Sequence, residues 1–432
     1  MPSETPGGHS ARPKNRSSRT SIDIEPTPAI IARPNPPDKV FRAKSRLVMD
    51  ILIDMTPLET DTRFHGIGYY ISSIGKAFLA LSDKERAGLS IAGLGTHAYS
   101  KNLAVVPLDF QGKKEPAYNR PEWNIRHWTE LVYLLRTKKP RLFHMTQPFG
   151  VPRGSGIPRI FTCHDILPLV LADQYLSGYL KPRLRKLNDR IRYQTAQRVI
   201  AISRHTADDL MRLLDVPAHR IDVIPHGVDH ERFNPPASPE EAAADALCRA
   251  RLGVDKAPYF LFLGAADPRK RGDLLISAFS AAKLEGVELI FAGRLAPSHK
   301  KSLEDALDRA GRPPSVRFLG FVADDSLVPL IRGAMALVYP STYEGFGLPV
   351  LEAMASGCPV VTTHATSLGE VAGDAALMAP PGDHEGLREA LVRIAQEPQL
   401  REELREKGFR RAAQFSWRET ALQTIGCYLR AL

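Results

Sequence analysis

Residues 335–361 read MALVYPSTYEGFGLPVLEAMASGCPVV, and this stretch decides the fold class. An apolar run ends at Pro340, and a turn of small and polar residues follows it. Pro349 suits the first turn of a helix, where its missing N–H would have no partner in any case. A second apolar run begins near Pro359. The order strand, turn, helix, strand is that of one βαβ unit in a parallel sheet.

The same alternation of short apolar runs and amphipathic segments extends over most of the chain. In the first half the runs lie at 47–53, 89–94, 142–146, 157–163 and 198–203. They resume after a Pro-, Ala- and Glu-rich stretch near 234–250, at 258–264, 287–293, 316–321, 335–340, 359–363 and 375–379. The pattern predicts an α/β fold with two Rossmann-like parallel-sheet domains facing a central cleft. We expect these domains at 45–235 and 236–412, followed by an amphipathic helix at 413–432.

Length and composition agree with this architecture. The chain has 432 residues, a length that exceeds what a single hydrophobic core usually organises. Of these residues, 43% are hydrophobic and 25% are charged, which is typical of a globular protein. Residues 1–44 are rich in Pro, Ser, Arg and Gly without apolar periodicity, which predicts a disordered tail. No apolar run approaches the roughly 20 residues of a membrane span, so we expect a cytoplasmic protein.

Cysteine spacing argues against a disulfide scaffold or a structural zinc site. The four cysteines are far apart and form no C-x-x-C pair. The two adjacent carboxylates Asp324 and Asp325 do not form a D-x-D motif after a strand. We therefore expect no metal ion and no other cofactor.

The net charge of +10 is concentrated in two stretches. Residues 1–44 carry eight basic and four acidic side chains, and residues 176–205 carry eight basic side chains against one acidic. The balanced remainder, without interleaved aromatic and basic residues, argues against a nucleic-acid partner.

A basic helix is expected after Pro182. Its apolar residues recur at helical spacing and should pack on the first domain, while the basic residues stay outside. The apolar positions are Leu184, Leu187 and Ile191, and the basic ones are Arg183, Arg185, Lys186, Arg190 and Arg192. This face is either only solvated, or binds peripherally to an anionic membrane surface or a phosphate-linked lipid acceptor.

The turn after the strand at 335–340 carries the residues of greatest chemical interest. Open parallel sheets bind ligands at the carboxyl ends of their strands. The backbone amides of Phe346, Gly347 and Leu348 would point out of a helix N-terminus, which favours an anion such as a diphosphate. Glu344 in the turn and Glu352 within the helix could accept hydrogen bonds from hydroxyl groups.

The string EGFGLPVLEAMASGCPVV resembles the E-x7-E signature of the family 4 retaining glycosyltransferases, which have the GT-B fold. The resemblance extends from about Ile51 to Trp417. It implies that Glu344 contacts the donor sugar and that Glu352 binds the ribose of the nucleotide. It also implies that the C-terminal helix returns to the first domain.

Three further segments fit the same family. In PRKRG (268–272), Lys270 matches the diphosphate-binding lysine, and Arg269 lies beside it. Many members have an arginine after the preceding glycine, whereas Ala265 and Ala266 stand here. Arg269 or Arg294 could replace it.

In the first domain, FTCHD (161–165) resembles the family's H-D motif, which implies that His164 lines the cleft and contacts the sugar. Asp165 would orient the loop. HGIGYY (65–70) resembles the first glycine loop, in which Gly66 and Gly68 allow close approach of phosphate or acceptor.

These observations predict a retaining hexosyltransferase that moves a sugar from a nucleotide-sugar donor to a glycan or lipid-linked acceptor. Similarity to a subgroup that includes mannosyltransferases of bacterial surface polysaccharide assembly makes GDP-mannose the expected donor. A sugar phosphorylase, a nucleotide-sugar epimerase and a non-catalytic nucleotide-sugar binding protein remain as alternatives.

Overall fold

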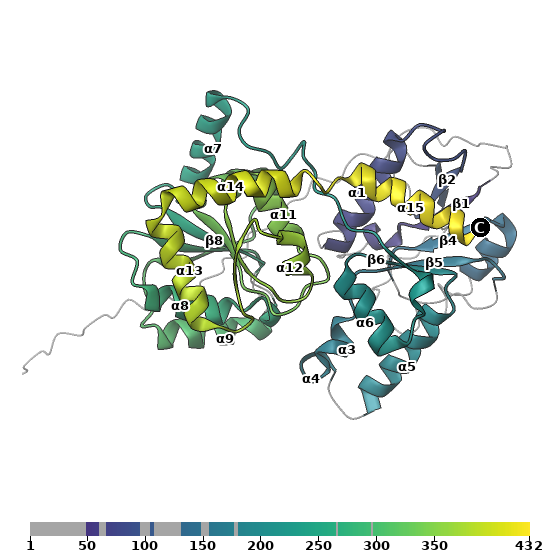
Figure 1. Cartoon of the computed structure of the whole chain (residues 1–432), viewed down its shortest axis with the longest axis horizontal. Helices are drawn as coiled ribbons and strands as arrows, with labels where there is room; N and C mark the ends of the chain where they lie inside the picture. The colour runs from purple at the N-terminus through teal and green to yellow at the C-terminus, as the bar shows by residue number, and fades with distance from the viewer. Residues whose placement is uncertain are drawn as a thin grey trace, which may run out of the picture. The chain divides into compact units, whose positions relative to one another are not determined.

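The computed structural model describes residues 49–59, 66–95, 104–107, 131–147, 155–176, 180–264, 267–294 and 297–432. Within these ranges the chain forms two parallel sheets with helices on their faces (Figure 1). This confirms the expected α/β class with two Rossmann-like sheets. The expected tail at 1–44 lies outside the described residues.

The first sheet has seven strands in the order β3-β2-β1-β4-β5-β6-β7. Ile51 on the central strand pairs with Ile91 on one side and Leu142 on the other. The strands are β1 (Ile51–Asp54), β2 (Ile91–Gly95), β3 (Ala104–Pro107), β4 (Leu142–Met145), β5 (Arg159–Cys163), β6 (Arg198–Ala201) and β7 (Ile221–Val223). The helices that follow these strands include α1 (Gly66–Ala80), α3 (Leu167–Val170), α4 (Ala172–Tyr175), α5 (Leu180–Gln194) and α6 (Arg204–Leu214).

The second sheet has six strands in the order β10-β9-β8-β11-β12-β13. They are β8 (Tyr259–Leu263), β9 (Glu288–Ala292), β10 (Val316–Gly320), β11 (Ala336–Tyr339), β12 (Val360–Thr363) and β13 (Leu377–Ala379). The helices are α7 (Pro239–Arg251), α8 (Gly272–Ala282), α9 (Pro297–Arg309), α10 (Asp324–Arg332), α11 (Leu348–Ala355), α12 (Ser367–Ala372), α13 (His384–Gln396) and α14 (Pro398–Ala412).

The strand order of the second sheet places two loops side by side. β8 and β11 are neighbours although three helices and two strands separate them in sequence. The direction of winding reverses between them, and such a switch point leaves a crevice at the carboxyl ends of the strands. Gly264 and the segment 340–347 directly follow these two strands.

The C-terminal helix α15 (Trp417–Ala431) packs against α1 of the first sheet (Figure 1). Its Ala421, Ile425 and Tyr428 are buried among side chains of α1 and β1. The hydroxyl group of Tyr428 lies 2.7 Å from Nδ1 of His144, whose Nε2 lies 2.8 Å from the hydroxyl of Thr162. Burial lowers the pKa of His144 to about 3, so this imidazole stays neutral and needs both partners.

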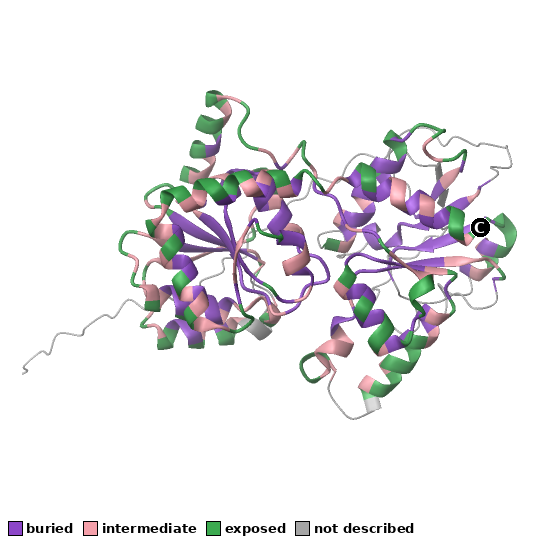
Figure 2. Cartoon of the chain, viewed as in Figure 1, coloured by how far each residue is buried: buried purple, intermediate pink, exposed green. Residues whose placement is uncertain are grey.

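The orientation of α5 differs from the sequence prediction. Leu184 and Leu187 are 63% and 55% exposed and do not pack on the domain, whereas Arg192, expected outside, is buried. The reason is Asp189, which is buried on the inner side of the helix and binds Arg185 at 2.5 Å and Arg192 at 2.7 Å. A buried ionic cluster therefore takes part of the inner face. The outer face of α5 is largely exposed in Figure 2.

Two strands of the first sheet, β3 and β7, were not expected from the sequence. The pattern gave no strand at β3 or at β7, and β7 is Ile-Asp-Val with partly buried or exposed side chains. No helix in the described ranges is both long and apolar enough to cross a membrane.

Tyr428→Phe should lower the free energy of unfolding by about 1–3 kcal/mol, because it leaves Nδ1 of the buried His144 without a partner. Urea titration followed by circular dichroism measures the change. Tyr133→Phe is the control, since Tyr133 is 72% exposed. Equal stability of the two variants would contradict the role given to this hydrogen bond.

Candidate functional site

A cavity of about 540 Å³ lies where the carboxyl ends of the two sheets meet. Every site residue expected from the sequence lines it except Gly68, which is buried within α1, and Arg294, the alternative to Arg269. The expected residues in its wall are Gly66, His164, Arg269, Lys270, Glu344, Phe346, Gly347, Leu348 and Glu352. The fold thus brings together residues from segments as far apart as α1 and α11.

Glu344 is buried in the loop that follows β11, and both of its carboxylate oxygens are bound. Oε1 accepts a hydrogen bond from Tyr339 at 2.8 Å, and Oε2 lies 2.5 Å from Nη1 of Arg269. Its backbone is held as well: the amide donates to Thr366, and the carbonyl accepts from Thr366 and Ser367. This carboxylate is therefore fixed at the cavity wall before any ligand arrives.

Arg269 faces Glu344. Its guanidinium also binds Asp267, with Nε 2.9 Å from Oδ2, and donates to the carbonyl of Tyr343 at 2.6 Å. Two carboxylates bind this one cation, so Arg269 is positioned to hold Glu344. That Arg269 replaces the absent arginine stays a prediction.

Lys270 is the cation without a direct partner. Nζ lies 5.3 Å from the ring centroid of Tyr339, and within the described part of the chain it pairs with no carboxylate. Burial lowers its pKa. A Cβ atom on Gly264, whose φ is +83°, would lie 2.2 Å from Nζ, so the glycine makes the room that the side chain occupies. Glu344 and Asp267 lie near enough to favour its charged form, although neither forms an ion pair with it.

The N-terminus of α11 opens toward the same space. Gly347 caps the helix with φ of +114°, and no side chain caps it. The amides of Phe346, Gly347 and Leu348 donate to no other described residue. Three unsatisfied donors at a helix start favour a bound anion. Gly345 makes the approach possible, because a Cβ there would lie 1.9 Å from the carbonyl oxygen of His164.

Glu352 points into the cavity from α11. Burial raises its pKa to about 7, and Arg232 opposes that rise. Its carboxylate has no hydrogen-bond partner among the described residues. Arg232, which also lines the cavity, is engaged by Asp324, with 3.5 Å between Nη2 and Oδ1. Glu352 can therefore accept hydrogen bonds from a ligand.

His164 lies on the opposite wall, directly after β5. Burial lowers its pKa to about 4, so the ring is neutral near pH 7. Its Nε2 lies 2.8 Å from the carbonyl oxygen of Thr146, which requires the proton on Nε2. Asp165 accepts from the amide of Leu167 at 3.1 Å, and its orienting role stays a prediction.

Several cavity residues were not expected from the sequence. Tyr69, His226, Arg232 and Phe321 all line the cavity. The Nδ1 atom of His226 is buried without a partner. Arg294 stacks on Phe321, 4.8 Å from its ring centroid, and Ala265 and Ala266 lie outside the described residues.

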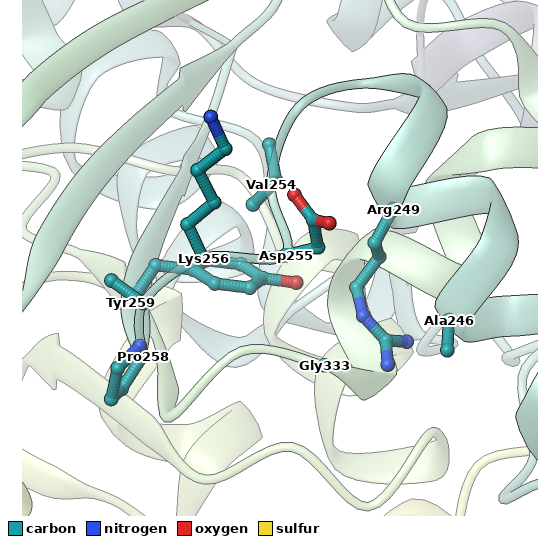
Figure 3. A pocket seen from close by; sticks show the side chains of 9 residues that line it. Ala246, Arg249, Val254, Asp255, Lys256, Pro258, Tyr259 and Gly333 are labelled. Atoms are coloured by element: carbon teal, nitrogen blue, oxygen red, sulfur yellow. The ribbon is translucent and has the colours of Figure 1, made fainter.

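A second pocket of about 350 Å³ lies beside the end of α7 and the start of β8 (Figure 3). Arg249 in its wall donates to the carbonyl of Pro329, and Tyr259 donates to that of Leu330. These polar groups are already satisfied within the protein, so we assign this pocket no ligand.

Comparison with known proteins places the chain among sugar-transferring enzymes. The family model described as glycosyl transferases group 1 matches residues 248–411, and the model described as Glycosyltransferase Family 4 matches residues 90–232. The O-antigen chain mannosyltransferase B of Escherichia coli is 34% identical over 316 residues, which are 71% of this chain and 78% of that protein.

Two other similarities are weaker. The serotype-specific mannosyltransferase WbdA of Escherichia coli is 25% identical over 421 residues, so the match spans 89% of this chain but 48% of WbdA. The crystal structure of Anabaena HepE in complex with UDP and glucose has a TM-score of 0.68 at 20% identity, covering 89% of this chain and 100% of that one. This last likeness shows the fold alone.

The raised pKa of Glu352 predicts a pH-dependent stability. Between the ordinary value of 4.5 and the folded value of about 7, the folded chain holds a proton that the unfolded chain has lost. The free energy of unfolding should therefore fall as pH rises through this window, by about 3 kcal/mol at most. Glu352→Gln removes this fall, whereas the exposed Glu389→Gln keeps it.

Urea titrations of the three proteins at pH 5, 6, 7 and 8 measure this difference. A constant gap between Glu352→Gln and the wild type across the range would show that Glu352 ionises normally.

Proposed function

The chain belongs to the family 4 glycosyltransferases, and from this premise we propose that it transfers a hexose from a nucleotide sugar to a glycan or lipid-linked acceptor with retention of configuration. The observation that carries the proposal is that one cavity holds both the Lys270 ammonium, which has no ion-pair partner among the described residues, and unsatisfied helix amides. That pairing fits a diphosphate flanked by a sugar and a ribose.

Each part of such a donor has a group to receive it. The amides at the start of α11 and Nζ of Lys270 would take the diphosphate. Glu352, which lacks a partner, would accept hydrogen bonds from the ribose, and Glu344 from the sugar. Negative charge grows on the leaving diphosphate in the transition state, so these fixed donors should supply the largest stabilisation.

His164 would contact the sugar as a neutral imidazole. Its proton on Nε2 is committed to the carbonyl of Thr146, which leaves Nδ1 as an acceptor. A ring with a pKa of about 4 is a poor general base near neutrality. His164 is better suited to orienting a sugar hydroxyl than to removing its proton.

GDP-mannose is the donor that we propose. The support is that both Escherichia coli relatives are named mannosyltransferases. A phosphorylase or an epimerase on the same fold would act on the same sugar with a different co-substrate. A non-catalytic binding protein has no need to fix Glu344 against Arg269. Because Lys270 and the amides at the start of α11 would already serve the diphosphate, we also propose that no metal ion takes part.

GDP-mannose should give the largest rise in melting temperature among GDP-, UDP- and ADP-sugars, and purified protein should release GDP from it with an acceptor extract.

Glu344→Gln should lower turnover at least tenfold, and Lys270→Ala should mainly weaken the binding of GDP, because the phosphate charge loses its partner. Turnover should survive EDTA.

Calorimetry and GDP release measure these effects, with Lys256→Ala, in the second pocket, as a matched lysine control. Stabilisation by UDP-sugars alone would contradict the donor. Equal GDP affinity in Lys270→Ala and wild type would contradict the site.

We further propose that the outer face of α5 binds an anionic membrane surface, as expected for an enzyme with a lipid-linked acceptor. The support is the exposure of Leu184 and Leu187 on a helix face flanked by basic side chains. Leucines between basic residues fit a lipid interface, where the apolar groups enter the headgroup layer and the cations meet anionic lipid. An RNA or DNA partner would leave the leucines in water.

Binding to phosphatidylcholine vesicles should require added phosphatidylglycerol and weaken with salt, because the Debye length is about 8–10 Å near physiological ionic strength. In the full chain, the triple change Arg183→Glu, Lys186→Glu, Arg190→Glu should lower binding tenfold or more, since each basic group contributes about 1 kcal/mol. Sedimentation with the vesicles measures binding.

Leu184→Ser with Leu187→Ser should also weaken vesicle binding, whereas Leu247→Ser, at an equally exposed leucine on α7, should not. Unchanged vesicle binding in the charge-reversed protein would show that α5 is only a solvated face.

A further inference from the structure

A chain of hydrogen bonds leads from α4 on the first sheet to the carboxylate of Glu344. The hydroxyl of Tyr175 donates to Oδ1 of Asp267 at 2.7 Å. The other oxygen of Asp267 accepts from Nε of Arg269 at 2.9 Å, and Nη1 of Arg269 lies 2.5 Å from Oε2 of Glu344. Tyr175 therefore touches neither Arg269 nor Glu344, but it touches the residue that orients them.

The same link also reaches the backbone of the Glu344 loop. Oδ1 of Asp267 accepts from the amide of Arg269 at 3.1 Å, which caps the short helix Pro268–Lys270. The carbonyl of Arg269 in turn accepts from the amide of Thr342 at 2.8 Å and from its hydroxyl at 3.1 Å. Any rotation of Asp267 would disturb both the side-chain and the backbone support of Glu344.

Tyr175 is suited to act as the donor in this chain. Partial burial, the adjacent Asp267 and the nearby Asp165 raise its pKa, whereas Arg269 lowers it, and the net effect keeps the hydroxyl protonated. The residue remains 37% exposed, so its ring contributes little core packing. The hydroxyl can therefore be removed without leaving a cavity.

We propose that Tyr175 is a positioning residue, which sets the Glu344 carboxylate when α4 is seated against the segment 267–270. This inference rests on the proposed function only in taking Glu344 as the group that meets the sugar. If Tyr175 has this role, the geometry of the donor site depends on a side chain of α4, a helix that follows a strand of the first sheet.

Tyr175→Phe in the full chain tests the proposal, with Tyr133→Phe as the matched control. Hydrogen exchange should quicken about two- to tenfold at the amides of Arg269 and Thr342, as expected for one lost hydrogen bond. With GDP-mannose, kcat should fall by a similar factor while KM for the donor stays the same. In an Asp267→Ala background, the Tyr175 change should add nothing, because its acceptor is gone.

Each outcome decides the question. Unchanged exchange at Arg269 and Thr342 overturns the proposal, and so does faster exchange with unchanged kcat. Faster exchange together with lower kcat in Tyr175→Phe, but not in Tyr133→Phe, supports it. If the wild type turns over no nucleotide sugar, the proposed function fails, and the exchange rates alone decide whether Tyr175 holds this loop.

Discussion

The ion pair between Arg269 and Glu344 is the constraint on which the rest of the site depends. It joins the loop after β8 to the loop after β11, at the point where the winding of the second sheet reverses. A buried pair of this kind is retained only when further hydrogen bonds satisfy both ions. Tyr339 supplies one for Glu344, and Asp267 and the carbonyl of Tyr343 supply two for Arg269. With the pair in place, Lys270 is the cation without an ion pair among the described residues that line the cavity.

Close backbone approach is the second constraint. Gly345 lies so near the carbonyl of His164 that any side chain would force the two loops apart, and the hydroxyl of Tyr343 donates to Asp209 on α6 at 3.0 Å. Backbone contact and a hydrogen bond thus hold the two loops together at the cavity wall, and the apolar side chains of Ile202 and Phe346 are buried in one cluster beside them.

The sequence predicted what depends on local pattern. Buried apolar runs marked most strands, and the string from Glu344 to Glu352 marked the turn and helix start that line the cavity. The partner of Arg269 could not be predicted, because it is set by two loops that meet only in the folded sheet. The exposed leucines of α5 could not be predicted either: periodicity identified an apolar stripe, but the ionic cluster around Asp189 decided which side faces inward.

The central claim is that a nucleotide sugar lies in this cavity with its diphosphate at the start of α11. A crystal structure of the protein with GDP-mannose tests it most directly. The account predicts diphosphate oxygens within hydrogen-bond distance of the amide of Gly347 and of Nζ of Lys270, with the ribose on Glu352 and the mannose beside Glu344. A diphosphate bound away from α11, or a ribose that does not reach Glu352, would contradict it.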